Sequence, residues 1–183
     1  MPVIAFLGKQ GSGKTLSMIR EALISYCNKM TIYSNLKLIG IKYEPIDLNW
    51  FMGYLLEKKE LRNVCVLIDE LQLYADCRSP KSKINRVLGY FALQTRKRNV
   101  KFLFTTQYFE NVDRRIRRCV MDDVIVRCEG KYVYNEEKKE PELKEIKQTI
   151  VFDGCSKYYT QTLTEPSKFF KYYVTGEVLP ILE

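Results

Sequence analysis

The chain has 183 residues, enough for one α/β domain with a substantial core. Its 46% of hydrophobic residues excludes an intrinsically disordered protein, and its net charge is +8. No apolar run approaches the roughly 18 residues that a membrane-spanning helix needs, and the N-terminus has no signal-peptide pattern. We therefore expect a cytoplasmic protein with no membrane span.

Strands and helices alternate in the first part of the chain. A short apolar run at residues 3–7 stops at a glycine, as a buried parallel strand does. Apolar residues recur at helical spacing over residues 14–27, and residues 31–35 form the next expected strand. Asp47 is placed to cap a helix over about residues 48–61.

The alternation continues to residue 126. Five consecutive apolar residues at 64–68 end in Asp69 and Glu70 and form the clearest strand of the sequence. The elements expected after it are a loop over 71–83, a helix over 82–97, a strand over 101–106, a basic helical turn over 113–119 and a strand over 124–126. This order predicts an α/β fold with a mainly parallel sheet and helices on both faces.

The character of the sequence changes after residue 128. A β-hairpin is expected there, with strands over 131–134 and 146–152 around a charged loop over 135–144. A strand and a short aromatic-rich helix are expected within residues 157–183. We therefore divide the chain into a core over residues 1–128 and a C-terminal extension over residues 129–183 that packs on the core.

One motif occupies the turn between the first strand and the first helix. Its eight residues fit GxxxxGK[ST] in full: Gly8, Lys9, Gln10, Gly11, Ser12, Gly13, Lys14 and Thr15. The glycines let the backbone point successive N–H groups at phosphate oxygens, and the following helix adds its positive dipole end. Lys14 is placed to bridge the β- and γ-phosphates, and the Thr15 hydroxyl to bind Mg²⁺. The motif predicts a site for a nucleoside triphosphate with Mg²⁺.

Polar residues follow two of the later strands. Asp69 ends the 64–68 strand, where a carboxylate is placed to hold the Mg²⁺ shell, and Glu70 beside it can act as the general base that polarises a water molecule. Gln107 ends the 101–106 strand, where it can reach the γ-phosphate or that water. We therefore expect Asp69 to be a magnesium ligand, and Glu70 and Gln107 to take part in catalysis.

Positive charge is concentrated in residues 78–118. This segment holds twelve Lys and Arg and two acids, a net charge of +10 that leaves −2 for the rest of the chain. Such a block favours a polyanionic partner such as nucleic acid, and a solvated, solubilising face is the alternative. The six cysteines form no CxxC pair and the chain has no histidine, so we expect reduced thiols and no zinc site.

The ordered set of motifs resembles a known family. The phosphate-binding loop, the strand ending in Asp69 and Glu70, and the strand ending in Gln107 are similar to those of the RecA-like, additional-strand P-loop ATPases with a catalytic glutamate, and within them to the FtsK/HerA superfamily of DNA pumps. LFTTQ followed by the basic VDRRIR looks most like the Zot-like branch and the small genome-packaging ATPases of membrane-containing viruses. The resemblance covers roughly residues 1–128.

The resemblance implies several features that the residues alone do not. The 101–106 strand is expected between the phosphate-loop strand and the Asp69 strand. The ATPase is expected to form a ring, a hexamer or a pentamer, with ATP at subunit interfaces and an arginine finger donated in trans. Arg96 matches the finger position, and Arg98 and Arg117 are the other candidates. Filamentous-phage Zot proteins carry a membrane-spanning segment, which this sequence lacks.

The resemblance leads to one principal hypothesis and several alternatives. The principal hypothesis is an ATP-hydrolysing motor that translocates double-stranded DNA, most plausibly into a viral capsid, with residues 78–118 gripping phosphates in the pore and with a capsid or portal protein as a further partner. Such a protein would act in the host cytoplasm or with the virion. The alternatives are a small-molecule kinase or regulatory P-loop NTPase, a plasmid or cellular DNA-transfer ATPase of the same superfamily, and a structural subunit that binds nucleotide without turnover.

Overall fold

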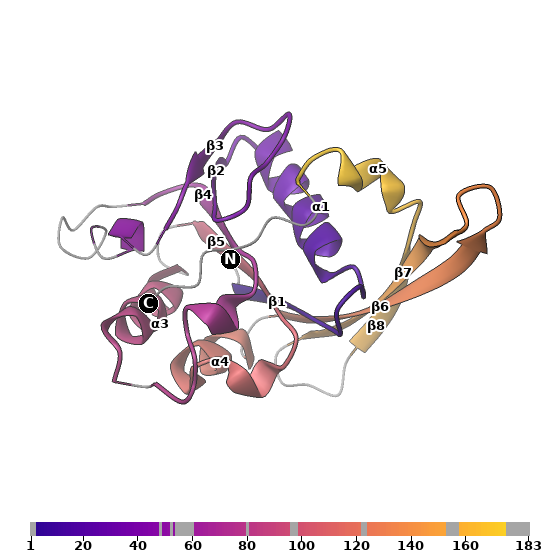
Figure 1. Cartoon of the computed structure of the whole chain (residues 1–183). Coiled ribbons are helices and arrows are strands. Elements are labelled where there is room, and N and C mark those ends of the chain that lie inside the picture. Colours follow the sequence, from indigo (N-terminus) through magenta and orange to yellow (C-terminus); the bar gives the residue numbers. More distant parts are fainter. Residues whose placement is uncertain are drawn as a thin grey trace.

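An eight-stranded sheet with helices on both faces organises the chain in the computed structural model (Figure 1), which describes residues 3–47, 49–51, 53, 61–79, 81–95, 99–121, 124–152 and 158–174. The elements are β1 (Val3–Leu7), α1 (Lys14–Cys27), β2 (Thr31–Ser34), β3 (Tyr43–Pro45), β4 (Val64–Ile68), η1 (Leu71–Leu73), α3 (Lys83–Gln94), β5 (Val100–Thr106), η3 (Phe109–Asn111), α4 (Arg114–Met121), β6 (Val124–Asn135), β7 (Glu140–Phe152), β8 (Tyr158–Thr164) and α5 (Ser167–Phe170). The strand order is β3-β2-β4-β5-β1-β6-β7-β8.

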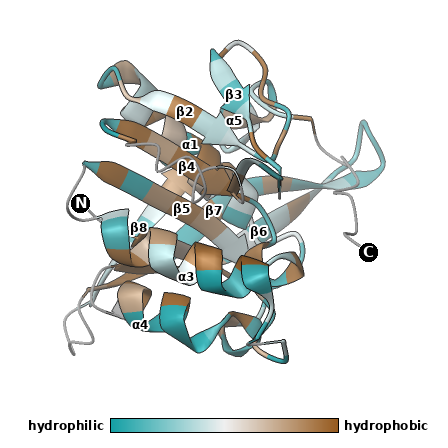
Figure 2. Cartoon of the chain, turned by 90° about the vertical axis from the view of Figure 1, so that its left-hand side faces the viewer, coloured by the Kyte–Doolittle hydropathy of each residue, from teal (hydrophilic) through white to brown (hydrophobic). Residues whose placement is uncertain are grey.

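The parallel part of the sheet runs from β3 to β6. Strands β1, β4 and β5 are buried along their whole length, and β1 and β4 are continuously apolar, as is typical of strands covered on both faces. Leu67 and Leu103 face the core under α1, while Phe102 and Phe104 face the core under α3 and α4. Figure 2 shows α3 and α4 next to each other on that second face. Since β5 lies between β4 and β1, the expected position of the 101–106 strand is confirmed.

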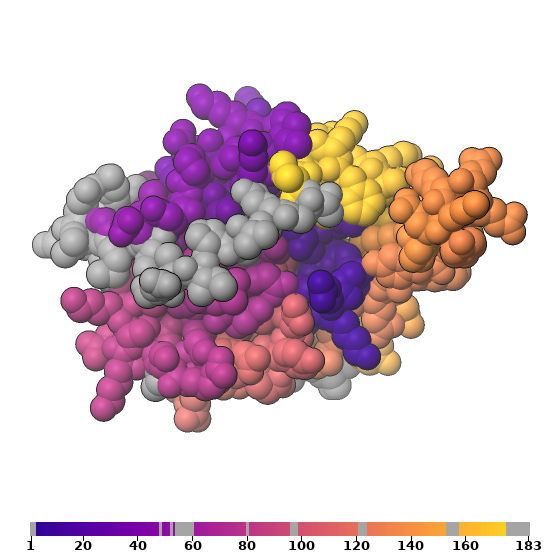
Figure 3. Space-filling model, viewed as in Figure 1, coloured from indigo at the N-terminus to yellow at the C-terminus, as the bar shows by residue number. Residues whose placement is uncertain are grey.

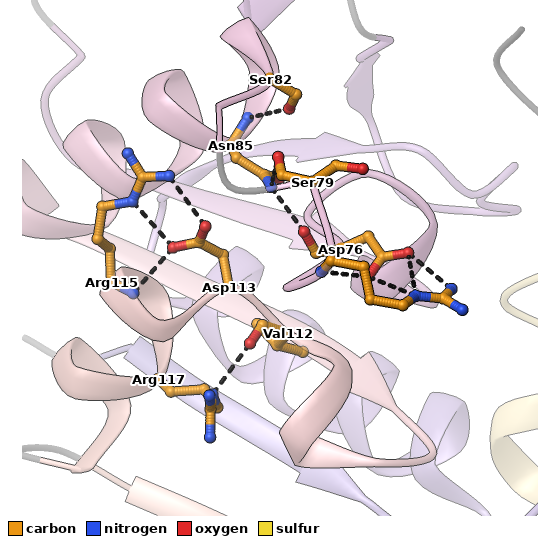
Figure 4. A network of polar contacts seen from close by, with 9 residues as sticks. Asp76, Ser79, Ser82, Asn85, Val112, Asp113, Arg115 and Arg117 are labelled. Carbon is orange, nitrogen blue, oxygen red and sulfur yellow. Dashed lines mark hydrogen bonds and ion pairs between the residues drawn. The ribbon is translucent and has the colours of Figure 1, made fainter.

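Side-chain caps fix where the helices begin. Ser82 Oγ accepts a hydrogen bond from the Asn85 N–H at 3.2 Å at the start of α3, and Asp113 Oδ1 accepts one from the Arg115 N–H at 2.9 Å at the start of α4 (Figure 4). Asp47 Oδ1 accepts from the Trp50 N–H at 2.7 Å, as a cap does. The rest of the helix expected over residues 48–61 lies mainly outside the described residues.

The C-terminal hairpin is longer than expected. Strand β6 continues through residues 124–135, where separate strands over 124–126 and 131–134 were predicted. Strand β7 begins at Glu140, inside the segment predicted to be a charged loop, and Asn135 pairs with Glu140. The charged residues are compatible with a strand because most of the backbone pairs with β6, apart from the register shift between Lys131 and Tyr132, while charged side chains such as Glu140 and Lys144 face solvent. The proposed division between residues 128 and 129 falls within β6 and remains a prediction.

The described residues contain no helix long and apolar enough to cross a membrane. Cys27, Cys65, Cys77, Cys119 and Cys128 are free thiols. Burial raises the pKa of the Cys65 thiol to about 12 and that of Cys128 to about 11, so both stay protonated and unreactive at neutral pH.

Candidate nucleotide site

The phosphate-binding loop joins the end of β1 to the start of α1. Gly11 and Gly13 have φ values of 77° and 84°, a left-handed conformation that favours glycine. A Cβ atom at Gly13 would also overlap the side chain of Ile146 on β7. The loop therefore takes its shape from its own glycines and from the strand packed against it.

The side chains that follow the loop meet the acidic pair after β4. Lys14 is buried, and its Nζ lies 3.3 Å from Glu70 Oε1. The Thr15 hydroxyl donates a hydrogen bond of 3.0 Å to Asp69 Oδ1. The structure thus brings together the four residues to which the sequence assigned phosphate binding, magnesium binding and general-base catalysis.

Two residues that the sequence analysis did not select hold the acidic pair in place. Thr105 on β5 donates to Asp69 Oδ1 at 2.7 Å and accepts from the Glu70 N–H at 2.9 Å. Asn35, just after β2, accepts from the Asp69 N–H at 2.8 Å and donates to the Asp69 carbonyl at 3.1 Å. The only sequence signal for these two residues was that each is polar and lies at the end of a strand, β2 for Asn35 and β5 for Thr105. These two strands flank β4 in the sheet.

The Asp69 and Thr15 oxygens fit a magnesium ion. Burial raises the pKa of the Asp69 carboxyl, while hydrogen bonds from Thr105 and Thr15 oppose that shift. Mg²⁺ prefers oxygen ligands and usually takes one or two from protein, with water and phosphate oxygens supplying the rest. The described part of the chain has no group of three or more His, Cys, Asp or Glu that would form a protein-only metal site. The donors present therefore suit magnesium held jointly with phosphate.

Gln107 lies next to the phosphate loop. It follows β5, whose last residue Thr106 pairs with Leu7 just before the phosphate loop. The Gln107 side chain is exposed and lines a cavity of about 680 Å³ together with loop residues Gly8 to Ser12. This cavity does not include Lys14, Thr15 or Asp69, and the catalytic role of Gln107 remains a prediction.

The three candidate arginine fingers are placed only in part. Arg96 and Arg98 lie outside the described residues. Arg117 lies on α4, where its Nε donates to the Val112 carbonyl at 3.0 Å (Figure 4). In this position Arg117 contacts the backbone of its own chain, and its action on a neighbouring subunit remains a prediction.

The basic segment separates into paired and exposed cations. Lys101 is buried and its Nζ lies 2.6 Å from Glu21 Oε1, so it is unavailable to an external partner. Arg115 pairs with Asp113 at 2.9 Å. The cations exposed on α3, on α4 and in the turn before α3 are Lys81, Lys83, Arg86, Arg114 and Arg118. A polyanion surface on the described part of residues 78–118 rests on these five cations and on Arg78, which pairs with Asp76 but is 83% exposed.

The sheet order, the glycine-rich loop and the acidic pair after β4 together define the fold of a P-loop NTPase. No protein-family model matches the sequence, and no curated protein matches it.

Solved structures share this fold at low sequence identity. The N-terminal domain of zonular occludens toxin from Neisseria meningitidis aligns over 94% of this chain and 98% of its own, with a TM-score of 0.68 and 18% identity. The genome packaging NTPase B204 from Sulfolobus turreted icosahedral virus 2, solved with ATP-gammaS, aligns over 87% of this chain and 96% of its own (TM-score 0.59, 12% identity). The pCW3 conjugation coupling protein TcpA aligns over 93% of this chain and 64% of its own (TM-score 0.54, 17% identity). The predicted fold is confirmed.

Proposed function

We propose that this chain binds ATP with Mg²⁺ on the phosphate loop, hydrolyses it and uses the energy to translocate double-stranded DNA. The observation that supports hydrolysis best is the placement of Glu70 beside Lys14, with Asp69 against Thr15. A protein that only binds nucleotide, or a kinase that transfers phosphate to an acceptor, does not need a carboxylate base at this point.

Nucleotide binding changes the partner of Lys14. The loop N–H groups and the Lys14 ammonium bind the phosphates, which compete with Glu70 for that ammonium. Thr15 and Asp69 would hold Mg²⁺, which would neutralise negative charge on the phosphate oxygens. Displaced from Lys14, the Glu70 carboxylate is available to accept a proton.

Hydrolysis then depends on where Glu70 points. Its backbone N–H is bonded to Thr105, and its Oε2 accepts from Gln72 Nε2 at 2.5 Å, so the carboxylate is held at the edge of the phosphate site. There it takes a proton from the attacking water, while Gln107 orients that water or contacts the γ-phosphate. An arginine of a neighbouring subunit, with Arg96, Arg98 and Arg117 as candidates, stabilises the charge on the transferring group.

DNA binding is assigned to the exposed cations of residues 78–118. Zonular occludens toxin, B204 and TcpA have this fold, and of these B204 is a DNA-packaging ATPase and TcpA is a conjugation coupling protein. By analogy we propose a hexameric or pentameric ring in which Lys and Arg grip phosphates without reading sequence. Genome packaging, with a capsid or portal protein as partner, is the setting we favour. A plasmid or cellular DNA-transfer ATPase is the alternative, and TcpA's relation to conjugation is the observation that favours it.

The test is the steady-state ATPase rate with and without long double-stranded DNA across a salt series. We expect DNA to stimulate turnover and the stimulation to fade as salt rises, because the contacts are with phosphates. Glu70→Gln is the blank, since a neutral amide cannot take the proton, and it should still bind ATP.

Two outcomes would contradict the proposal. A rate indifferent to DNA at every salt concentration would shift the assignment to a kinase or regulatory NTPase. Normal ATP affinity in Lys14→Ala would contradict the phosphate-loop assignment itself.

A further inference from the structure

The C-terminal hairpin and α5 close the nucleotide site on the side away from the core. A cavity of about 530 Å³ has one wall made by the phosphate loop and the first residues of α1, with Asp69 beside them. The facing walls belong to the hairpin and to the segment around α5: Tyr132, Lys138, Glu140, Pro141, Glu142, Leu143, Ser167, Phe170, Tyr173 and Val174. In Figure 3 the yellow α5 region lies above the indigo phosphate-loop region, with the orange hairpin beside both.

From this arrangement we propose that β6, β7 and α5 form the nucleoside subsite of the phosphate loop, with the Phe170 ring as the surface that the base covers. The inference rests on the proposed binding of a nucleoside triphosphate. Lys14, Thr15 and Asp69 fix the phosphates at one wall of this cavity, so the attached sugar and base occupy the space toward the hairpin and α5. The neighbouring 680 Å³ cavity reaches loop residues Gly8 to Ser12 but neither Lys14 nor Thr15.

The chemistry of the walls suits a nucleoside. Phe170 is 37% exposed and Tyr132 is 48% exposed, which leaves apolar ring surface open to a planar base. Phe170 is also supported from behind, because its ring stacks on that of the buried Tyr173 with centroids 6.4 Å apart. Glu140 at the start of β7 adds a carboxylate acceptor for ribose hydroxyls or for an amino group of the base.

The test compares ATP with inorganic tripolyphosphate, which has the phosphates but no nucleoside. Equilibrium binding of each ligand in the presence of Mg²⁺ is measured by calorimetry on the full chain. We expect Phe170→Ala to weaken ATP binding by roughly 5- to 150-fold, the range for loss of one base stack, and to leave tripolyphosphate binding unchanged. Phe152→Ala is the matched control, because that ring is 39% exposed and does not line the cavity.

Each other result overturns the subsite. Equal ATP affinity in the wild type and in Phe170→Ala would place the nucleoside elsewhere. An equal loss for ATP and tripolyphosphate would show that the ring supports the loop and makes no contact with the base. If the wild type bound neither ligand, the proposed function would fail, and with it the subsite.

Discussion

The parallel and antiparallel halves of the sheet differ in how their residues are buried. In the parallel half every residue of β5 is buried, and its sequence VKFLFTT is apolar or small-polar except for Lys101, which pairs with Glu21. In the antiparallel half, β7 alternates between buried residues such as Ile146 and Ile150 and charged residues that face solvent. One half is therefore stabilised by a core on both faces, and the other by a core on the α1 side and by backbone pairing.

The phosphate loop lies where these halves meet. The parallel half supplies the polar side chains of the candidate site, since Asp69 and Glu70 follow β4 and Thr105 lies on β5. The antiparallel half contacts the loop backbone, because Tyr132 donates to the Gly11 carbonyl at 2.5 Å and Ile146 packs at Gly13. Catalytic groups and loop shape thus come from different parts of the chain, and variants can separate the two contributions.

The largest effect is expected from Gly13→Ala, which presses the loop against the antiparallel half. The new Cβ overlaps Ile146, and the residue keeps a φ of 84° that alanine rarely adopts. Crowding alone costs about 1–3 kcal/mol, and any shift of the loop also misplaces the N–H groups that bind phosphate. We expect loss of measurable ATP binding and a lower urea midpoint.

Gly40→Ala is the control for that variant. Gly40 has a similar φ of 70°, but a Cβ there meets nothing within 4 Å. It therefore carries the same backbone strain without the crowding, and ATP binding should persist. Equal damage in the two variants would mean that the contact between β7 and the loop is unimportant.

The next effect is expected in the parallel half from Thr105→Val. The substitution keeps the side-chain shape, removes the donor to Asp69 and leaves the Glu70 N–H without its acceptor. We expect kcat to fall roughly 10- to 100-fold because the proposed base and the proposed magnesium ligand lose their fixed positions. ATP affinity should change less than kcat, as single-turnover kinetics would show.

Thr106→Val is the matched control on the same strand. Thr106 is also buried, but its hydroxyl donates to the Tyr108 carbonyl and touches neither Asp69 nor Glu70. If both valine variants lowered kcat equally, the effect would belong to β5 as a whole.

Much of the parallel half was predictable from the sequence, for physical reasons. A strand buried on both faces is mainly apolar, so β1 and β4 were visible as continuous apolar runs and β5 as an apolar run interrupted by Lys101. Only glycine tolerates the turns of the phosphate loop, which makes that site readable as a motif. Asn35 and Thr105 were not predictable in the same way, since their roles depend on the strand order that brings them beside Asp69.

The antiparallel half was predicted less accurately from the sequence, because strands rich in charged residues have the composition of a loop. Residues 140–144 read EPELK, a composition typical of loops, yet they pair with β6. The hydrogen bond from Tyr132 to Gly11 joins residues 121 positions apart in the chain, so no local sequence pattern predicts it. The sequence therefore indicated a hairpin but not that the hairpin forms a wall of the nucleotide site.

A smaller effect is expected from Asp113→Asn on α4, which packs on both β1 and β6 at the junction of the halves. Burial favours a higher pKa for Asp113, but hydrogen bonds from Arg115 more than reverse this, so the pKa lies below its usual value. A lowered carboxyl pKa gives stability that is present above the unfolded value of about 3.9 and is lost as pH falls through the folded pKa.

Because Arg115 is 39% exposed, we expect Asp113→Asn to lose only about 1 kcal/mol in urea unfolding at pH 7. The difference from the wild type should shrink at pH 3. Asp76→Asn is the control, since its partner Arg78 is 83% exposed, and it should change little at either pH. A pH-independent loss in Asp113→Asn would assign the effect to capping of α4 and not to charge.

The smallest effect is expected from Tyr132→Phe, which removes the hydroxyl that links the hairpin to the Gly11 carbonyl and keeps the ring. Since this side chain is 48% exposed, water can replace part of the bond, and the cost should be about 0.5–1 kcal/mol. We expect ATP and tripolyphosphate to bind two- to fivefold more weakly, by equal factors, because the hydroxyl acts on the loop and not on the nucleoside. Tyr134→Phe, on the same strand and 62% exposed, should bind both ligands as the wild type does. Unchanged binding in Tyr132→Phe would mean that the parallel half alone sets the shape of the loop.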